Sequence, residues 1–442
     1  MASQQTPEET RYPSLLAGSF TLGVLVLAFI VSFVDRQVLA LLVNPIQADL
    51  GVGDFEMSLL VGFAFALFYC VLGIPLGKVA DRTNRKRLIA FGIVLWSFAT
   101  ILCGFANSFV ALFFFRMLVG VGEATLAPAG YSLLADTFPP HRLVRATAIF
   151  SLGGMLGAGV AMLVGGQVID YATTAEQAPF GLDAFEPWQA TFIIVGAPGF
   201  VVAGLILLAR EPVRKGTAKA TEVSAKTLAY LWERRRDYAP IYAAATGMAV
   251  VSYGGLTWFP THVIRTFGIT AGEAGLILGS IQIVGAILGT LLGVMLTEKL
   301  IRMGHPDGHL RSVMITALFA AATLIAPLMG SLELTAAVWF LSTIFQNAYY
   351  GSLTAALQII TPNQSRGTNS AVFVLVITMF GLAVGSALIG GLAQFAFSDE
   401  PRGVGYGIAI VGTAAALFAS ASAWWGMKHY RQIVSAHLPP VG

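Results

Sequence analysis

The sequence contains little charge, since only 11% of its 442 residues are Asp, Glu, Lys or Arg and 56% are hydrophobic. A soluble domain carries about 25% charged residues, so an ordinary water-facing globular surface is excluded. The phosphate-binding pattern GxxxxGK[ST] is absent, which excludes a nucleotide held by such a loop. Cysteine is scarce as well. Cys70 and Cys103 both fall inside apolar runs, so we expect them to pack as small side chains and not to form a disulfide or a metal pair.

Patterns typical of catalysis and metal binding are also missing. None of the six histidines lies deep in an apolar run. His305 and His309 share a loop that contains Pro and Gly, whereas a zinc protease needs a helical HExxH pattern. We therefore expect no enzymatic activity, no metal site and no bound cofactor.

Apolar runs of about 20 residues, the length that crosses a bilayer, recur along the whole chain. No segments of about ten residues with alternating apolar and polar positions are seen, which excludes a membrane β-barrel. The sequence predicts an all-α polytopic membrane protein with twelve transmembrane helices, at residues 15–42, 56–78, 87–107, 109–135, 145–171, 188–209, 238–262, 273–298, 310–329, 333–359, 367–396 and 404–430.

Basic residues concentrate in every second turn between these spans, and such an excess marks the cytoplasmic side. The opposite turns hold only Arg265 and Arg402. We predict a multi-pass protein of the cell (inner) membrane with both termini cytoplasmic. The net charge of +3 then reflects topology and does not indicate nucleic-acid binding.

Two halves are visible on either side of the longest cytoplasmic connection. The fifth span of each half carries a related stretch, LVGG at 163–166 and LIGG at 388–391. We predict an N-terminal six-helix bundle over 1–210, a linker over 211–236 and a C-terminal six-helix bundle over 237–442, in a monomer. Parallel six-helix repeats are a known plan of transporters, with the substrate near the membrane midplane.

The stretch GKVADRTNRKR, residues 77–87, follows the second span. It resembles the signature loop of the major facilitator superfamily, although Asn84 stands where that family often has glycine. The matching positions, which we assign to a cytoplasmic gate, are Gly77, Asp81, Arg82 and Arg85.

Each residue of this loop has a physical role to offer. Gly77 allows the close approach of another helix, and Asp81 can face the positive end of the eleventh helix. Arg85 can bridge to Asp136 at the end of the fourth span, a contact that would keep the gate shut in one state. The alternative is a basic loop that only fixes topology.

Four charged residues lie inside predicted spans of the first half: Asp35, Arg36, Arg116 and Glu123. Such groups cost about 2.5 to 3.5 kcal/mol each on insertion scales and are functional by default. Asp35 and Arg116 both lie about 10 Å below the outer surface at 1.5 Å per residue, so we expect them to pair. Arg36 points about 100° away from Asp35, which indicates a different partner.

Glu123 lies about two turns deeper than Arg116, near the midplane, and Pro128 interrupts the helix one turn further on. Burial raises the pKa of a carboxyl group and a neighbouring guanidinium lowers it, so small changes in the surroundings can change whether the group is protonated. We therefore predict Glu123 and Asp35 as proton-coupling residues, with the proton as the coupling ion. The alternative is a static salt bridge that holds two helices together.

The Asp35–Arg36 pair and the stretch R116-x3-G120-x-G122-E123-A124, with YSLLADTFPP after it, resemble the spinster family of that superfamily. Spinster proteins transport lysolipids and sphingosine phosphate, several of them with protons. The resemblance implies a major facilitator fold, alternating access and a small amphiphilic lipid as substrate. Arg36 and Arg116 would bind its head group, since guanidinium forks match phosphate.

A second family, the organic anion:cation symporters, also fits GEATLAP, and a drug:proton antiporter of the same superfamily is a further alternative. Two arginines could bind a carboxylate as well as a phosphate. The second half offers aromatic and amide groups without a central cation, which favours a cavity for an acyl tail. The residues that we predict to line it are Tyr253, Trp258, Gln346, Asn347 and Tyr350.

Overall fold

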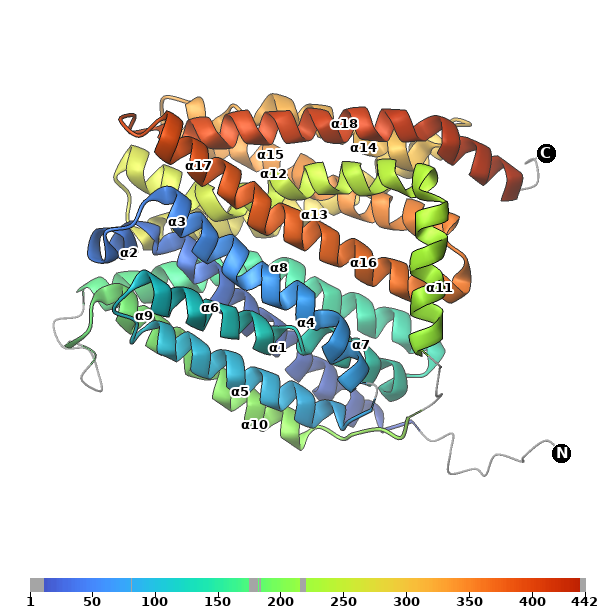
Figure 1. Ribbon diagram of the computed structural model, residues 1–442, viewed down its shortest axis with the longest axis horizontal. Coiled ribbons are helices and arrows are strands. Elements are labelled where there is room, and N and C mark those ends of the chain that lie inside the picture. The colour runs from blue at the N-terminus through green and yellow to red at the C-terminus, as the bar shows by residue number, and fades with distance from the viewer. Residues whose placement is uncertain (1–11, 81, 175–181, 183, 215–219, 438–442) are drawn as a thin grey trace. The chain divides into compact units, whose positions relative to one another are not determined.

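The computed structural model describes residues 12–80, 82–174, 182, 184–214 and 220–437, and in these ranges the regular structure is helical throughout (Figure 1). Its helices are α1 Leu15–Leu41, α2 Val43–Leu50, α3 Asp54–Ser58, the π-helix η1 Leu59–Phe63, α4 Ala64–Ala80, α5 Arg85–Cys103, α6 Phe109–Glu123, α7 Leu126–Thr137, α8 Pro140–Thr174, α9 Pro187–Gly196, α10 Pro198–Leu208, α11 Ala220–Glu233, α12 Arg235–Phe267, α13 Ala271–Arg302, α14 Gly308–Thr323, the 3₁₀ helix η3 Ala326–Leu328, α15 Leu332–Ile360, the 3₁₀ helix η4 Asn363–Ser365, α16 Arg366–Thr378, the π-helix η5 Met379–Gly385, α17 Ser386–Ala396 and α18 Gly403–His437.

Ten helical segments of the described part of the chain are long and apolar enough to cross a membrane. The other two predicted spans correspond to α12 and α15, which are 33 and 29 residues long. Each of the twelve predicted spans therefore coincides with a helical segment, and the expectation of an all-α polytopic membrane protein is confirmed.

The fourth predicted span is not one continuous helix. α6 ends at Glu123, and α7 begins at Leu126 with Pro128 in its first turn. Proline has no N–H to donate and its ring collides with the preceding turn, so it is tolerated near a helix start and breaks a helix elsewhere. The predicted interruption at Pro128 is confirmed, and it leaves Glu123 as the last residue of α6.

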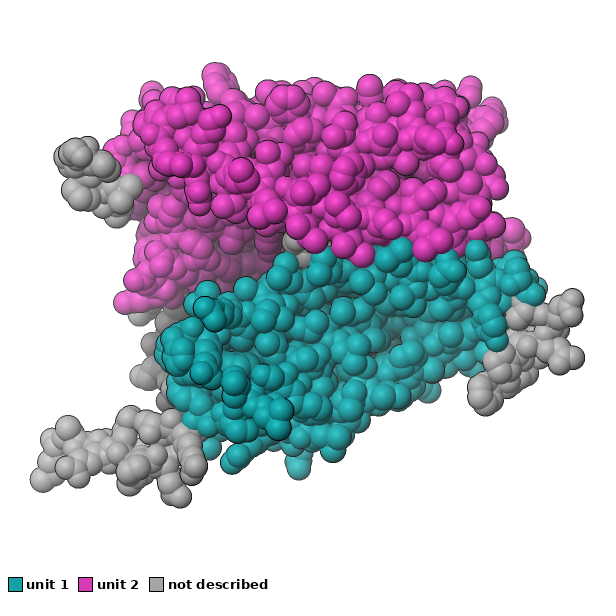
Figure 2. Space-filling model, turned by 180° about the vertical axis from the view of Figure 1, so that it is seen from behind, with its two compact units in different colours: residues 1–38, 67–218 teal, residues 39–66, 219–442 magenta. Residues whose placement is uncertain are grey.

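The chain forms two compact units, which Figure 2 shows in different colours. Unit 1 comprises residues 1–38 and 67–218, and unit 2 comprises residues 39–66 and 219–442. Residues 39–66 thus pack with the C-terminal part of the chain, although they lie in the predicted N-terminal bundle. The grouping follows packing and not sequence repeats, so the division into two six-helix bundles stays a prediction.

In unit 1, α5 and α6 approach closely where both have glycine. A Cβ atom at Gly122 would lie 2.7 Å from the backbone nitrogen of Trp96 and 2.8 Å from the carbonyl oxygen of Gly92. Side chains larger than hydrogen would force the helices apart. This close approach fixes the position of the neighbouring Glu123 in the interior of unit 1.

Candidate functional site

Two of the four charged residues predicted inside the first-half spans, Arg36 of α1 and Glu123 at the end of α6, form an ion pair in unit 1. The NH2 nitrogen of Arg36 lies 2.5 Å from Oε2 of Glu123, and the same oxygen accepts a hydrogen bond from the Ser32 hydroxyl at 2.8 Å. The two charged side chains are only 8% and 1% exposed. A charge-assisted hydrogen bond of this kind is among the stronger ones in a protein interior.

Two aromatic rings lie against the Arg36 guanidinium. Its carbon lies 4.8 Å from the ring centre of Phe33 and 5.4 Å from that of Tyr69 in α4. Both distances fall within the range of cation–π attraction. The rings therefore add electrostatic stabilisation to this buried cation beside its ion pair with Glu123.

Asp35 and Arg116 come together, but not as an ion pair. The NH1 group of Arg116 donates to the backbone carbonyl oxygen of Asp35 at 3.1 Å. Neither carboxyl oxygen of Asp35 has a hydrogen-bond partner among the described residues. The predicted side-chain pairing is therefore wrong in this structure, because the guanidinium is aimed at the α1 backbone. Both side chains are fully buried.

Further buried polar atoms around these residues lack hydrogen-bond partners in the described part of the chain. They include Nε and NH2 of Arg116. An unpaired polar group in an apolar interior is costly. The site thus holds donors and acceptors that a proton, water or substrate could satisfy. No group of three or more His, Cys, Asp or Glu side chains is arranged to hold a metal ion among the described residues.

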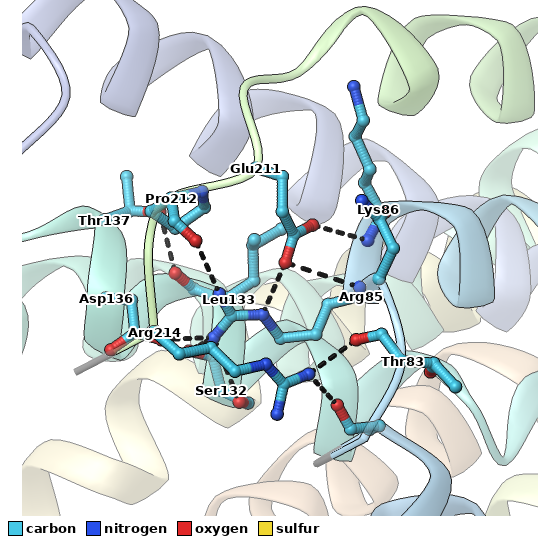
Figure 3. Close-up of polar contacts among 12 residues, drawn as sticks. Thr83, Arg85, Lys86, Ser132, Leu133, Asp136, Thr137, Glu211, Pro212 and Arg214 are labelled. Atoms are coloured by element: carbon cyan, nitrogen blue, oxygen red, sulfur yellow. Dashed lines mark hydrogen bonds and ion pairs between the residues drawn. The ribbon is translucent and has the colours of Figure 1, made fainter. Parts of the chain in front are cut away.

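A second polar cluster lies at the start of α5 (Figure 3). The fully buried guanidinium of Arg85 forms an ion pair with Asp136 of α7, as predicted, and donates to the carbonyl oxygen of Ser132 at 2.9 Å. Its Nε donates to Glu211 at 2.8 Å and its NH2 to the Pro212 carbonyl oxygen at 3.1 Å. Arg85 thereby ties α5 to α7 and to the chain that follows α10.

Glu211 is the member of this cluster that sequence reasoning missed. Besides Arg85 Nε, its carboxylate accepts the backbone N–H of Lys86 at 3.1 Å (Figure 3). A carboxylate is favourable there because the first N–H groups of a helix have no partner within it. The available signal is the charged stretch REPVR at 210–214, directly after the sixth span, in which Glu211 is the first residue of the predicted linker.

The other predicted gate residues have different outcomes. A Cβ atom at Gly77 would meet only Pro128, at 3.8 Å among the described residues, so the close approach predicted there is not found. Arg82 is exposed, and its side chain has no hydrogen bond or ion pair with a described residue. Asp81 lies outside the described residues. Arg214, which was not predicted, donates to the carbonyl oxygens of Ala80 and Thr83 at 2.5 Å.

The residues predicted to line a cavity in the second half lie in unit 2. Trp258 is fully buried, and its indole N–H donates to the Ser386 carbonyl oxygen at 3.0 Å. It packs inside the unit, so the prediction that it lines a cavity is wrong. Gln346 is also buried and donates to Ser342 at 2.8 Å.

The remaining three predicted cavity residues keep some exposed surface. Tyr253 and Asn347 are partly buried, and Tyr350 is 46% exposed. The Asn347 amide donates to the Thr343 carbonyl oxygen in its own helix at 2.8 Å. A role in substrate contact stays a prediction for these residues.

Comparison with known proteins places the chain in a family. A family model described as Major Facilitator Superfamily matches residues 25–385. An MFS-type efflux pump of Mycolicibacterium smegmatis is 27% identical over 413 residues, which are 93% of this chain and 92% of the pump. A probable galactarate/D-glucarate transporter of Bacillus subtilis is 26% identical over 76% of both chains.

Spinster proteins are also similar. Protein spinster homolog 1 of Homo sapiens is 28% identical over 66% of this chain and 57% of its own length. The crystal structure of a bacterial homolog of the human lysosomal transporter spinster, inward-facing and unoccupied, is 26% identical and has a TM-score of 0.82. That match covers 97% of this chain and 100% of the bacterial protein. The chain belongs to the Major Facilitator Superfamily of membrane transporters, and within it the chain resembles the spinster family.

Proposed function

We propose that this protein is a proton-coupled secondary transporter that moves an amphiphilic substrate, of the lysophospholipid or sphingosine-phosphate kind, by alternating access. The observation that carries this proposal is the buried ion pair between Arg36 and Glu123. Two opposite charges in a membrane interior are expensive to insert and are functional by default.

Glu123 is the first proton-coupling residue of this scheme. Protonation of its carboxylate removes the negative charge that holds the Arg36 guanidinium and leaves Ser32 with a weaker acceptor. Arg36 is then free to bind a phosphate of the substrate, supported by the rings of Phe33 and Tyr69. Substrate and Glu123 compete for one cation, which couples proton binding to substrate binding.

Asp35 is the second acid of the scheme, and Arg116 is its neighbour. Among the described residues Arg116 hydrogen-bonds through NH1, to the α1 backbone, and its Nε and NH2 groups have no partner there, so these two groups can reach a substrate oxygen or a water molecule. A proton on Asp35 would remove a buried negative charge close to both Arg116 and Glu123, whose charges act on Asp35 in opposite senses. Proton movement between the two acids would change the field around both arginines.

The cluster around Arg85 has a structural part in this scheme. It joins the ends of α5 and α7 and the segment after α10 within unit 1. We infer that it keeps these ends together as one body when the transporter changes state. The predicted closure of a cytoplasmic gate by this cluster depends also on Asp81, which belongs to the same loop.

The lipid substrate is supported by the similarity to spinster proteins over most of the chain. A second candidate, a small organic anion, is favoured by the galactarate/D-glucarate transporter, which matches 76% of the chain. Arginine forks bind carboxylate as well as phosphate. Drug:proton antiport is a third candidate, and the similarity to an MFS-type efflux pump favours export.

Flux into proteoliposomes tests the proposal. Labelled lysophospholipid, galactarate and a cationic drug are offered to the reconstituted protein with and without an imposed pH gradient. We expect gradient-stimulated flux of the lysophospholipid, and loss of the stimulation in Glu123→Gln. Glu298→Gln, an exposed acid of α13, is the matched control and should behave as wild type. Flux of galactarate without flux of the lysophospholipid would show that the substrate is a small anion and not a lipid. Gradient-stimulated flux in Glu123→Gln would show that Glu123 has no part in proton coupling.

A further inference from the structure

The corner between α11 and α12 in unit 2 carries an exposed surface that the transport scheme does not use. α11 runs across the ends of the long helices of this unit instead of along them (Figure 1). It packs against α16 and η4, with Thr227 donating to the Ser365 hydroxyl at 3.0 Å. Tyr230 and Leu231 lie against the apolar core of the unit. One face of α11 is thereby occupied by protein.

The neighbouring face of α11 is apolar but uncovered. Leu228 and Trp232 are one turn apart, so they lie side by side on the helix. Their exposed fractions are 52% and 73%. The guanidinium carbon of Arg235 lies 5.6 Å from the Trp232 ring centre, and Arg234 stands over Tyr230 at 5.4 Å. Leucine, tryptophan and arginine in one row are typical of a segment at a membrane–water interface.

Three consecutive arginines, Arg234, Arg235 and Arg236, end this row. All three are exposed, and none has an ion pair with a described residue. Glu233 and Asp237 flank them, so the corner keeps a net positive charge. Side chains that serve only to orient the chain in the membrane need no aromatic partner, whereas two of these arginines lie against rings.

We propose that this corner binds the head groups of anionic phospholipids in the bilayer. Leu228 and Trp232 lie at the level where acyl chains meet head groups, and the arginines donate to lipid phosphates. Guanidinium forks match phosphate oxygens in geometry and charge. The arginine backbone positions are fixed by the junction of two helices, so little ordering is needed when a lipid binds.

Fluorescence quenching by brominated lipids tests this site. The full chain is placed in lipid nanodiscs that contain bromines either on phosphatidylglycerol or on phosphatidylcholine, at the same mole fraction. Because Trp424 and Trp425 are also exposed, the contribution of Trp232 is taken as the difference between wild type and Trp232→Phe. We expect Trp232 to be quenched at a lower mole fraction of phosphatidylglycerol than of phosphatidylcholine.

Substitution of the arginines identifies the cause of that preference. Arg235→Gln should raise the phosphatidylglycerol fraction needed for half-quenching by about fivefold, and the triple change to glutamine at 234, 235 and 236 should abolish the preference. Lys299→Gln with Arg302→Gln, two exposed cations at the end of α13, should leave it unchanged. Equal quenching by both lipids, no quenching of Trp232, or an equal loss in the α13 variant would overturn the proposal. Arg235→Lys keeps the charge but loses the guanidinium fork, so it should retain only part of the preference.

Discussion

Glu211 binds the start of α5 through both oxygens of its carboxylate. Oε1 accepts a hydrogen bond from Arg85 Nε at 2.8 Å, and Oε2 accepts one from the Lys86 backbone N–H at 3.1 Å. Glu211→Ala would leave the buried Arg85 with only part of its partners. We expect a loss of about 1 to 3 kcal/mol of stability, since hydrogen bonds to buried charged groups are lost. Thermal unfolding of the purified protein measures it.

The matched control for this change is Glu298→Ala, which alters an exposed acid and should shift the midpoint little. Glu211→Gln keeps acceptors in place and should fall between wild type and alanine. An unchanged midpoint in Glu211→Ala would show that the carboxylate contributes nothing to the cluster.

The Arg36–Glu123 pair should show strong coupling in a double-mutant cycle. Breaking a buried pair leaves the other charge uncompensated, at a cost of about 3 to 5 kcal/mol. We therefore expect Arg36→Gln and Glu123→Gln each to lower the free energy of unfolding. The double variant should lose less than the sum of the two single losses. Glu298→Gln with Lys299→Gln, an exposed pair in α13, should be additive. Additive effects at Arg36 and Glu123 would mean that the interaction between these two side chains contributes no free energy to stability.

Gly122 and Gly77 should differ sharply when each is replaced by alanine. A Cβ atom at Gly122 would lie under 3 Å from the backbone of α5, whereas one at Gly77 would meet an atom only at 3.8 Å. Overpacking of this kind costs about 1 to 3 kcal/mol, so Gly122→Ala should lower the unfolding temperature and displace Glu123. Gly77→Ala should leave the unfolding temperature near that of wild type. The reverse order would contradict the close approach of α5 and α6.

Acid should weaken unit 2 through Asp307, a buried residue just before α14. Its carboxylate accepts hydrogen bonds from Arg311 Nε and Arg431 NH2, both at 2.9 Å. Burial alone raises the pKa of Asp307, but the bonds from Arg431 and Arg311 outweigh it and hold the pKa below its ordinary 3.8. The stabilisation is therefore present above the unfolded-state pKa and is lost as the pH falls through the lower folded-state pKa.

Unfolding temperatures of wild type and Asp307→Asn, measured from neutral pH down to about pH 3, check this sign. The difference between the two proteins should be largest at neutral pH and should shrink only below about pH 4. A difference that stays constant with pH would show that the carboxylate charge plays no part.

The features that could be predicted from the sequence are those that follow from apolar length, from a known motif or from the chemistry of one residue. Apolar length predicted all twelve helical segments, and the signature loop predicted the Arg85–Asp136 pair. Pro128 predicted the break after Glu123 because proline cannot donate its nitrogen. Each of these features follows from local chemistry or from a spacing that leaves few alternatives.

The partner of each arginine was harder to predict. Depth counted along a helix has an uncertainty of about one turn, because span ends are uncertain by two to four residues. An arginine side chain reaches further than that. Arg36 therefore reaches Glu123. Arg116 donates to the backbone carbonyl oxygen of Asp35, and a partner on the backbone cannot be predicted from the pattern of side chains. The prediction for Trp258 is wrong for a similar reason. The sequence around an aromatic residue in a span does not distinguish a side chain that packs inside the protein from one that lines a cavity.

Residues 39–66, which pack with unit 2, have a consequence for any attempt to produce the two halves of the protein separately. Arg265 of α12 holds this segment through hydrogen bonds to Asn44, Gln47 and Asp54. Gly62 of η1 lies so close to Leu382 of η5 that a Cβ atom would stand 2.3 Å from its carbonyl oxygen. A C-terminal fragment cut at the linker would lack these partners and expose the surface they cover. Only co-expression with the N-terminal fragment, or a graft of residues 39–66, would restore it.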